Sequence, residues 1–143
     1  PPPPPPPPPF LMIRPPPSYT LFPYTTLFRS EGIARVASCL REIGPRFERS
    51  DVYAQLLRAR LFADWNGIEP LDFEAASFEA GRLAGFQCRH DDPRLDGGFW
   101  FGRRGAECMP YINPVSAGFG LQALAMWQEH LSGERRTFRH LLI

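Results

Sequence analysis

One stretch of the sequence, residues 96–127, constrains the fold most. It begins with two adjacent glycines and three aromatic residues, and it ends in a run that is almost wholly apolar or small, Val115–Met126. Asn113 and Pro114 precede this run and are typical of a helix N-cap and of the first helical position, where the N–H that proline lacks has no partner anyway. A helix that is apolar on every side is buried on every side, so we expect other helices to surround it.

The spacing of apolar residues predicts three more helices before this stretch. The first covers residues 32–43 and ends at Gly44-Pro45, and the second begins at Ser50-Asp51, a good N-cap pair. The third follows Pro70, is capped by Asp72 and carries an apolar stripe as far as Ala84. Between it and the apolar run, Phe99–Phe101 predicts a short strand, 103–105 a turn and 108–112 a return strand that Pro110 confines to an edge. The expected fold class is therefore all-α with one short β-hairpin.

The first thirty residues do not resemble a natural protein segment. Residues 20–30 are the translation of a common short-read sequencing adapter, and over residues 12–30 the adapter frame matches 16 of 19 positions, counting five matches in 12–19 and eleven in 20–30. The nine prolines at the start fit a homopolymer read. We therefore expect residues 1–30 to be an artefactual leader, residues 31–133 the helical domain, and residues 134–143 a C-terminal tail.

Composition excludes several classes of function once the leader is set aside. Two of the 16 basic residues, Arg14 and Arg29, lie in the leader, so 16 − 2 = 14 remain against 15 acidic residues, and the formal charge becomes −1. Neither sign forms a block, so no nucleic-acid partner is expected. No apolar run reaches the length of about 18 residues that spans a bilayer, so no membrane span is expected.

The cysteines bear on the compartment, and the motifs of the sequence bear on cofactors. Cys39, Cys88 and Cys108 are an odd number without CxxC spacing, and they favour small buried side chains in a reducing, cytoplasmic compartment. The sequence contains no glycine-rich phosphate loop, no GxSxG and no HExxH, so neither a cofactor nor a metal is expected.

Three segments carry a resemblance to a known family. Phe86-Gln87 at the end of a helix, followed by Asp96–Phe99 and by the Ala- and Leu-rich stretch 121–125, resembles the repeat of α/α toroids, most closely the prenyltransferase and squalene-cyclase type. The resemblance implies a partial (α/α) toroid of about four helices, the C-terminal part of a longer protein. It also implies that the rest of the toroid is the main partner, and that isolated helix pairs expose apolar surface.

The same resemblance implies a prenyltransferase- or terpenoid-cyclase-like function. The acid motif of the cyclases, Asp-x-Asp-Asp, is not present, because Asp91-Asp92 lacks the earlier aspartate, so the catalytic residues remain unknown. Two alternatives stay open: a carbohydrate-active toroid of the epimerase, glycan hydrolase or lyase type, and a non-catalytic helical scaffold. The parent reading frame would distinguish the three.

The candidate ligand contacts are aromatic. Trp100, Phe101 and Tyr111 could line a cavity for an apolar or sugar ligand through their π faces, or they could simply pack the hairpin. A cluster of polar residues follows the third predicted helix: His90, Asp91, Asp92 and Asp96. It could form a metal or acid–base site, but a solvated loop is the favoured interpretation. His130 is interpreted as a favourable charge near a helix C-terminus.

Overall fold

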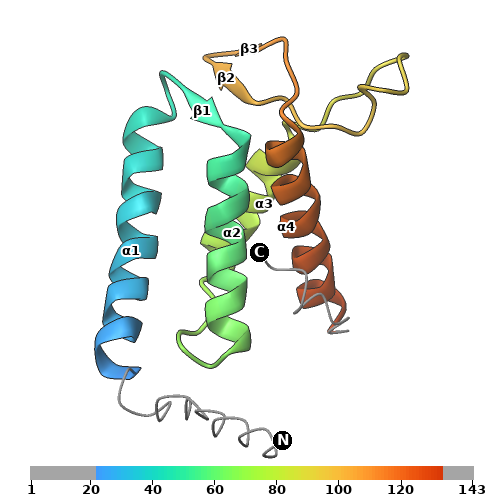
Figure 1. Cartoon of the computed structure of the whole chain (residues 1–143). Coiled ribbons are helices and arrows are strands. Elements are labelled where there is room, and N and C mark those ends of the chain that lie inside the picture. Colours follow the sequence, from blue (N-terminus) through green and yellow to red (C-terminus); the bar gives the residue numbers. More distant parts are fainter. Residues whose placement is uncertain (1–21, 134–143) are drawn as a thin grey trace, which may run out of the picture.

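The computed structural model describes residues 22–133. The leader and tail predictions for residues 1–21 and 134–143 therefore lie outside the described residues. The described chain forms four helices and a small antiparallel sheet, so the predicted all-α fold with a short hairpin is confirmed (Figure 1). The helices are α1 (Phe22–Ile43), α2 (Ser50–Trp65), α3 (Phe73–Ala84) and α4 (Pro114–Ser132).

The helices alternate in direction along the chain. In Figure 1, α2 and α4 run the same way, and α1 and α3 run opposite to them. The most extensive helix contact is between α2 and α4, followed by that between α2 and α3. The core lies where α2, α3 and α4 meet. Its largest fully buried apolar side chains are Leu57, Leu61, Leu83, Phe86, Phe99 and Met126.

The first helix begins ten residues earlier than expected. It extends from Phe22 rather than Gly32. Pro23 stands in the first turn, where a missing N–H costs nothing, and no glycine or proline follows until Gly32. The helix therefore continues across part of the segment assigned to the leader, whose origin in an adapter stays a prediction.

The first helix is held more loosely than the others. It makes few contacts with α2 compared with those that α2 makes with α3 and α4. Within residues 31–43, Ala37 is the only buried side chain, and Val36 and Ile43 are exposed. Apolar grooves consequently run between α1 and α2.

Two of the three predicted N-caps, Asp72 and Asn113, are confirmed, and the third, Ser50, is wrong. The carboxylate of Asp72 accepts from the Ala75 N–H, the Asn113 side chain accepts from the Val115 N–H, and Gly133 adopts the left-handed conformation after α4. Ser50 does not cap α2: Arg49 is the N-cap residue, and its side chain makes no capping bond. The Ser50 hydroxyl instead donates to the Phe101 carbonyl, because a third strand brings that segment alongside.

The sheet contains the predicted hairpin and one strand that the sequence did not predict. Its strands lie elsewhere than predicted: β2 (Gly102–Arg104) covers part of the predicted turn, residues 103–105, and pairs with β3 (Glu107–Cys108). In the predicted first strand, 99–101, Phe99 and Trp100 form only isolated bridges, to Gln87 and Ile112. Strand β1 (Glu48–Arg49) pairs with the other edge of β2, which gives the order β1-β2-β3. This strand carries the start of α2 to the hairpin.

The double-glycine bend packs beneath α4. Gly97 has a φ of 79°, which a residue with a side chain rarely adopts, and Gly98 lies close to the Ile112 side chain. Phe99 follows and is 2% exposed. A Cβ on Gly120 of α4 would come within 2.9 Å of the Phe99 ring. The absence of a side chain at residue 120 therefore lets the ring contact the helix backbone.

The prediction that the apolar run is buried on every side is wrong in this chain. Ala123 and Met126 are buried, but Val115, Leu121 and Leu131 are 61%, 68% and 56% exposed. The reason is that, among the described helices, only α2 packs extensively against α4, and α3 makes a much smaller contact with it, so the rest of its surface stays open. Exposed apolar surface is what the resemblance to a toroid repeat implies for an isolated unit.

The structure also bears on two other predictions, which concern the cysteines and a membrane-spanning helix. All three cysteines are free, but only Cys88 is buried; Cys39 is exposed, so its assignment as a core residue is wrong. Cys39 lies on α1, where little of the surface is covered. None of the helices in the described part of the chain is long and apolar enough to cross a membrane.

Candidate functional site

The three predicted aromatic contacts separate into two environments. Trp100 is half-buried and packs against the core. Phe101 and Tyr111 stack on the hairpin with centroids 5.0 Å apart, and the guanidinium of Arg49 lies 4.8 Å from the Phe101 ring. None of the three lines the cleft described below. Their present contacts are hairpin packing, and a role in ligand binding stays a prediction.

The polar group around His90 holds a loop together. The His90 N–H donates to Asp96, the Asp92 N–H donates to Nδ1 of His90, and Arg94 forms an ion pair with Asp92 at 2.6 Å. The hydrogen bond from Arg94 lowers the pKa of Asp92. The other three members of the group are exposed. These contacts match the interpretation of a solvated loop.

The second predicted histidine lies at the end of α4. The His130 ring stacks on Trp127 with centroids 5.8 Å apart, and its Nδ1 is 3.9 Å from a carboxylate oxygen of Asp64. Its place in the last turn of α4 fits the predicted interaction with the helix C-terminus.

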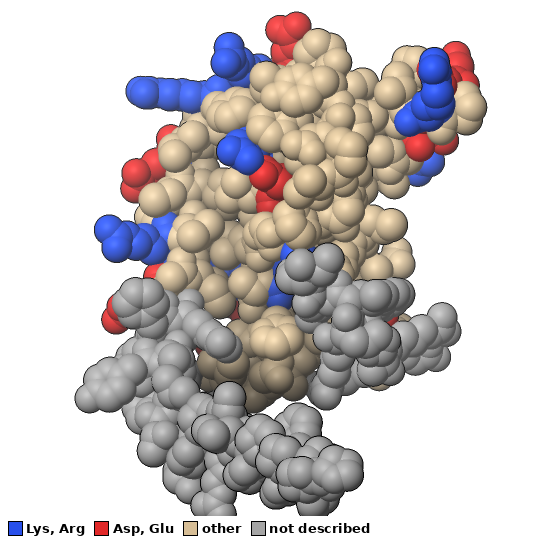
Figure 2. Space-filling view, in the orientation of Figure 1, with Lys and Arg blue, Asp and Glu red and all other residues tan. Residues whose placement is uncertain are grey.

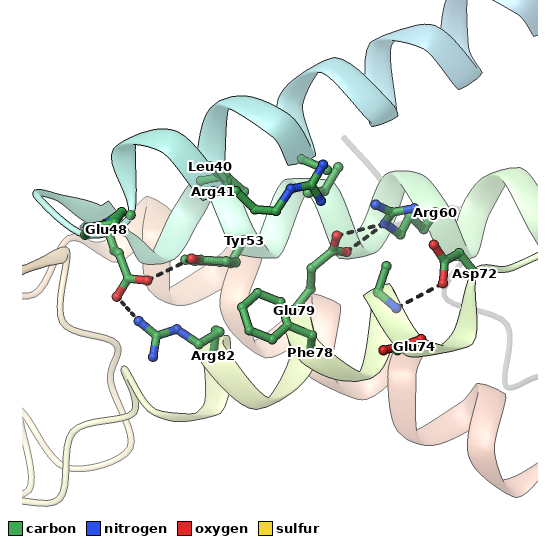
Figure 3. A pocket seen from close by; sticks show the side chains of 15 residues that line it. Leu40, Arg41, Glu48, Tyr53, Arg60, Asp72, Glu74, Phe78, Glu79 and Arg82 are labelled. Carbon is green, nitrogen blue, oxygen red and sulfur yellow. Dashed lines mark hydrogen bonds and ion pairs between the residues drawn. The ribbon is translucent and has the colours of Figure 1, made fainter.

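A cleft between α1 and α3, with α2 as its floor, gathers charged side chains that the sequence did not single out (Figure 3). Its volume is about 640 Å³. Leu40, Leu56 and Phe78 contribute apolar walls. The polar side chains come from all three helices and β1: Arg41, Glu48, Tyr53, Arg60, Asp72, Glu74, Glu79 and Arg82.

One end of the cleft holds a three-residue network. The Tyr53 hydroxyl donates to Oε1 of Glu48 at 2.8 Å, and Arg82 forms an ion pair with the other oxygen of the same carboxylate. Glu48 belongs to β1, Tyr53 to α2 and Arg82 to α3. The network therefore connects β1, α2 and α3 at this end of the cleft. The dashed lines in Figure 3 mark its hydrogen bonds.

The middle of the cleft holds a nearly buried ion pair. Nε of Arg60 lies 2.8 Å and 3.0 Å from the two carboxylate oxygens of Glu79. Only 11% of the Arg60 side chain and 4% of the Glu79 side chain are exposed. A pair so far from water interacts strongly, and each partner would be costly to leave alone.

Burial and hydrogen bonding shift three ionisable groups in the cleft. Burial raises the pKa of Glu79 to about 7, against the opposing charge of Arg60. Burial, with the hydrogen bond to Glu48, raises the pKa of Tyr53 to about 12. Burial also acts to raise the pKa of Glu48, but the hydrogen bonds from Arg82 and Tyr53 outweigh it and hold that pKa below its ordinary value. Glu48 is thus ionised at neutral pH, whereas Glu79 is poised between its two forms.

The cleft offers acid–base chemistry rather than a metal site. Among the described residues, no group of three or more histidine, cysteine or carboxylate side chains is arranged to hold a metal ion. A carboxyl group with a pKa near neutrality, in a partly apolar cleft, is suited to exchanging a proton with a bound molecule. Glu79 is the described group that meets this condition.

One signal in the sequence pointed to Glu79. It stands between Ala76, Ala80 and Leu83 on the apolar stripe of α3, where a carboxylate needs a partner. Nothing local pointed to Glu48 or to the choice of Arg60, because their partners lie 34 and 19 residues away. These pairings depend on how the helices cross.

Comparison of the chain with models of protein families, with curated proteins and with solved structures finds no match.

Proposed function

We propose that this chain binds a small amphipathic molecule in the cleft between α1 and α3 and exchanges a proton with it through Glu79. The observation that carries the proposal is the poised carboxyl group of Glu79, placed in a cleft with apolar walls at Leu40, Leu56 and Phe78. The ligand class follows from this lining: an apolar body with a group that donates a hydrogen bond to a carboxylate.

Binding of indole tests the proposal, since indole combines an apolar ring with one N–H donor. In NMR titrations of the ¹⁵N-labelled chain, we expect indole to shift amide signals of all three helices that line the cleft. 1-Methylindole, which lacks the donor, should bind more weakly, by about the 0.5–1.5 kcal/mol of one hydrogen bond. Glu79→Leu should abolish the difference between the two ligands.

Glu74 provides the matched control, because it lines the same cleft on the same helix but is exposed. Glu74→Leu should preserve the preference for indole. Equal binding of the two indoles to the unaltered chain, or no saturable shift in the cleft, would refute the proposal. A ¹³C titration of the Glu79 carboxyl group, with a midpoint near 7 that moves when indole is bound, would support it.

We also propose that α1–α4 form two helix pairs of an α/α toroid. Two observations favour this: α2 and α4 lie parallel and in extensive contact, with α1 and α3 antiparallel to them, and the double-glycine bend packs against α4 at Gly120. The resemblance then implies a parent protein of the prenyltransferase or terpenoid-cyclase type, whose remaining helices are the partner. A carbohydrate-active toroid and a non-catalytic scaffold are the alternatives.

The reading frame in the source genome separates these parents. An Asp-rich acid motif preceding the codon for Glu31 would support a cyclase-like enzyme, and Glu, Asp or His residues on inner helices would support a carbohydrate-active one. A frame that encodes neither would leave the scaffold. We propose a cytoplasmic location from the three free cysteines, and a signal sequence in that frame would contradict it.

A further inference from the structure

A second arginine on α2 lies on the side of the helix away from the cleft. Arg58 and Arg60 are two residues apart, which places them about 160° from each other around the helix axis. Arg60 points to Glu79 on α3, so Arg58 lies on the side where α2 meets α4. That side faces the viewer in Figure 1, in which α3 is behind.

Arg58 is buried without a carboxylate. It is 7% exposed, its Nη1 donates to Oε1 of Gln55 at 2.7 Å, and its guanidinium carbon lies 4.9 Å from the centre of the Phe119 ring. No described carboxylate is within ion-pair distance, and Nε is buried with no hydrogen-bond partner. Burial lowers the pKa of Arg58.

The contacts that Arg58 makes offset only part of the free-energy cost of burying its charge. Stacking on an aromatic ring returns only part of the free energy that removing a cation from water costs. One neutral amide oxygen adds one more hydrogen bond. The guanidinium group still has an unused N–H at Nε. An arginine side chain presents its N–H groups in a planar fork that matches the two oxygens of a carboxylate.

The surroundings of Arg58 define the rest of the ligand. Phe62 follows one turn later on α2 and is 39% exposed, and Val115 precedes Phe119 by one turn on α4 and is 61% exposed. In the part of this face that Figure 2 leaves uncovered by grey atoms, most side chains are uncharged, and charged ones gather over the sheet, along α1 and on the loop after α3. One cation between apolar side chains matches one negative charge on an apolar body.

We propose that Arg58, together with Gln55 and Phe119, binds the carboxylate of an amphipathic monocarboxylic acid, whose apolar part lies along Phe62 in the groove between α1 and α2. This site is separate from the cleft and does not depend on the function proposed for it. A single guanidinium group neutralises a carboxylate but leaves a phosphate dianion half compensated, so the carboxylate is the favoured head group.

Calorimetric titration of the full chain with octanoate tests this assignment. We expect saturable binding that weakens at least tenfold in Arg58→Met, and a smaller loss in Arg58→Lys, which keeps the charge but not the fork. 1-Octanol should bind at least tenfold more weakly than octanoate, and octyl phosphate should bind no more tightly than octanoate.

Arg49→Met is the matched control. Arg49 also stacks on a phenylalanine ring at the start of α2, but it already has a carboxylate partner, Asp51. Octanoate should bind this variant as it binds the unaltered chain. Equal losses in the two methionine variants, equal binding of octanol, tighter binding of octyl phosphate or no binding of octanoate would each overturn the proposal. If Arg58→Met does not fold, amide shifts on octanoate binding that miss Gln55 and Phe119 in the unaltered chain would overturn it.

Discussion

Each side of α2 carries a buried arginine, but the two arginines have different kinds of partner. Toward α3, Arg60 is nearly buried and has a carboxylate partner in Glu79. Toward α4, Arg58 is also buried, but among the described residues its partners are only an amide oxygen and an aromatic ring. The first side is electrostatically complete within the chain. The second side is not, and the difference shows that burial alone does not identify a structural arginine.

This contrast separates a site for proton exchange from a site for an anion. On the cleft side the chain supplies both charges, so an added ligand has to compete or to exchange a proton with Glu79. On the other side the described residues supply only the cation. The following predictions test whether the two sides differ as described.

The largest effect is expected when the paired side is broken. Arg60→Ala leaves the Glu79 carboxylate buried without its cation, and at pH 8 the free energy of unfolding should fall by about 3–5 kcal/mol. Urea denaturation followed by circular dichroism measures this. At pH 5, where Glu79 is protonated, the loss should be clearly smaller. An equal loss at the two pH values would show that Glu79 is not the group left unpaired.

The next effect is the change in the free energy of unfolding with pH that Glu79 causes. Glu79 has a raised pKa in the folded state, about 7 against 4.5, so the folded state binds its proton more tightly than the unfolded state does. Stability is therefore lost as pH rises from 4.5 to 7, by on the order of 3 kcal/mol. The difference between the unfolding curves of the unaltered chain and Glu79→Gln isolates this contribution.

Glu48 should give the opposite slope at lower pH. Its pKa is depressed in the folded state, so its stabilising contribution is present above 4.5 and is lost as pH falls through the folded pKa. Comparing the unaltered chain with Glu48→Gln between pH 2 and pH 6 measures that loss. A Glu48 contribution that grows on acidification would contradict the assigned direction.

A smaller effect tests the position of α4, which supplies Phe119 to the unpaired side. Gly120→Ala brings a methyl group within 2.9 Å of the Phe99 ring, and overpacking of this kind costs about 1–3 kcal/mol. Gly118 lies on the opposite, open side of the same helix. Gly118→Ala should instead stabilise the chain by up to about 1 kcal/mol, because alanine favours the helix. Thermal unfolding of both variants gives the comparison.

The smallest effect is expected at Arg58 itself. Arg58→Met keeps the length of the side chain and removes the buried charge, so the free energy of unfolding should change by less than about 1 kcal/mol, and a gain is as acceptable as a loss. Urea denaturation beside Arg60→Ala sharpens the contrast. A loss as large as that of Arg60→Ala would indicate a structural ion pair at Arg58.

The sequence predicted the elements better than it predicted the site. Apolar spacing and capping residues such as Asp72 and Asn113 are local signals, and the structure follows them. Strand β1 is two residues long and exists only because β2 lies beside it, so no local pattern predicted it. For the same reason Ser50 looked like an N-cap, although its hydroxyl bonds to Phe101, 51 residues away.

The site was hidden because it depends on distant partners. Arg58 and Arg60 look alike in the sequence, and only the crossing of α2 with α3 and α4 gives one a carboxylate and the other a phenyl ring. The aromatic residues at 100, 101 and 111 were conspicuous because they are clustered, but in the structure they contact one another and the core. Glu79, a single carboxylate on an apolar stripe, was the more informative signal.

The loose attachment of α1 gives the cleft one adjustable wall. With Ala37 as the only buried side chain in residues 31–43, little free energy is needed to lift that wall from α2 while the other three helices stay assembled. The width of the entrance is then set by what occupies it. Slower amide hydrogen exchange along α1, with no change in α4, would indicate that a ligand is bound in the cleft.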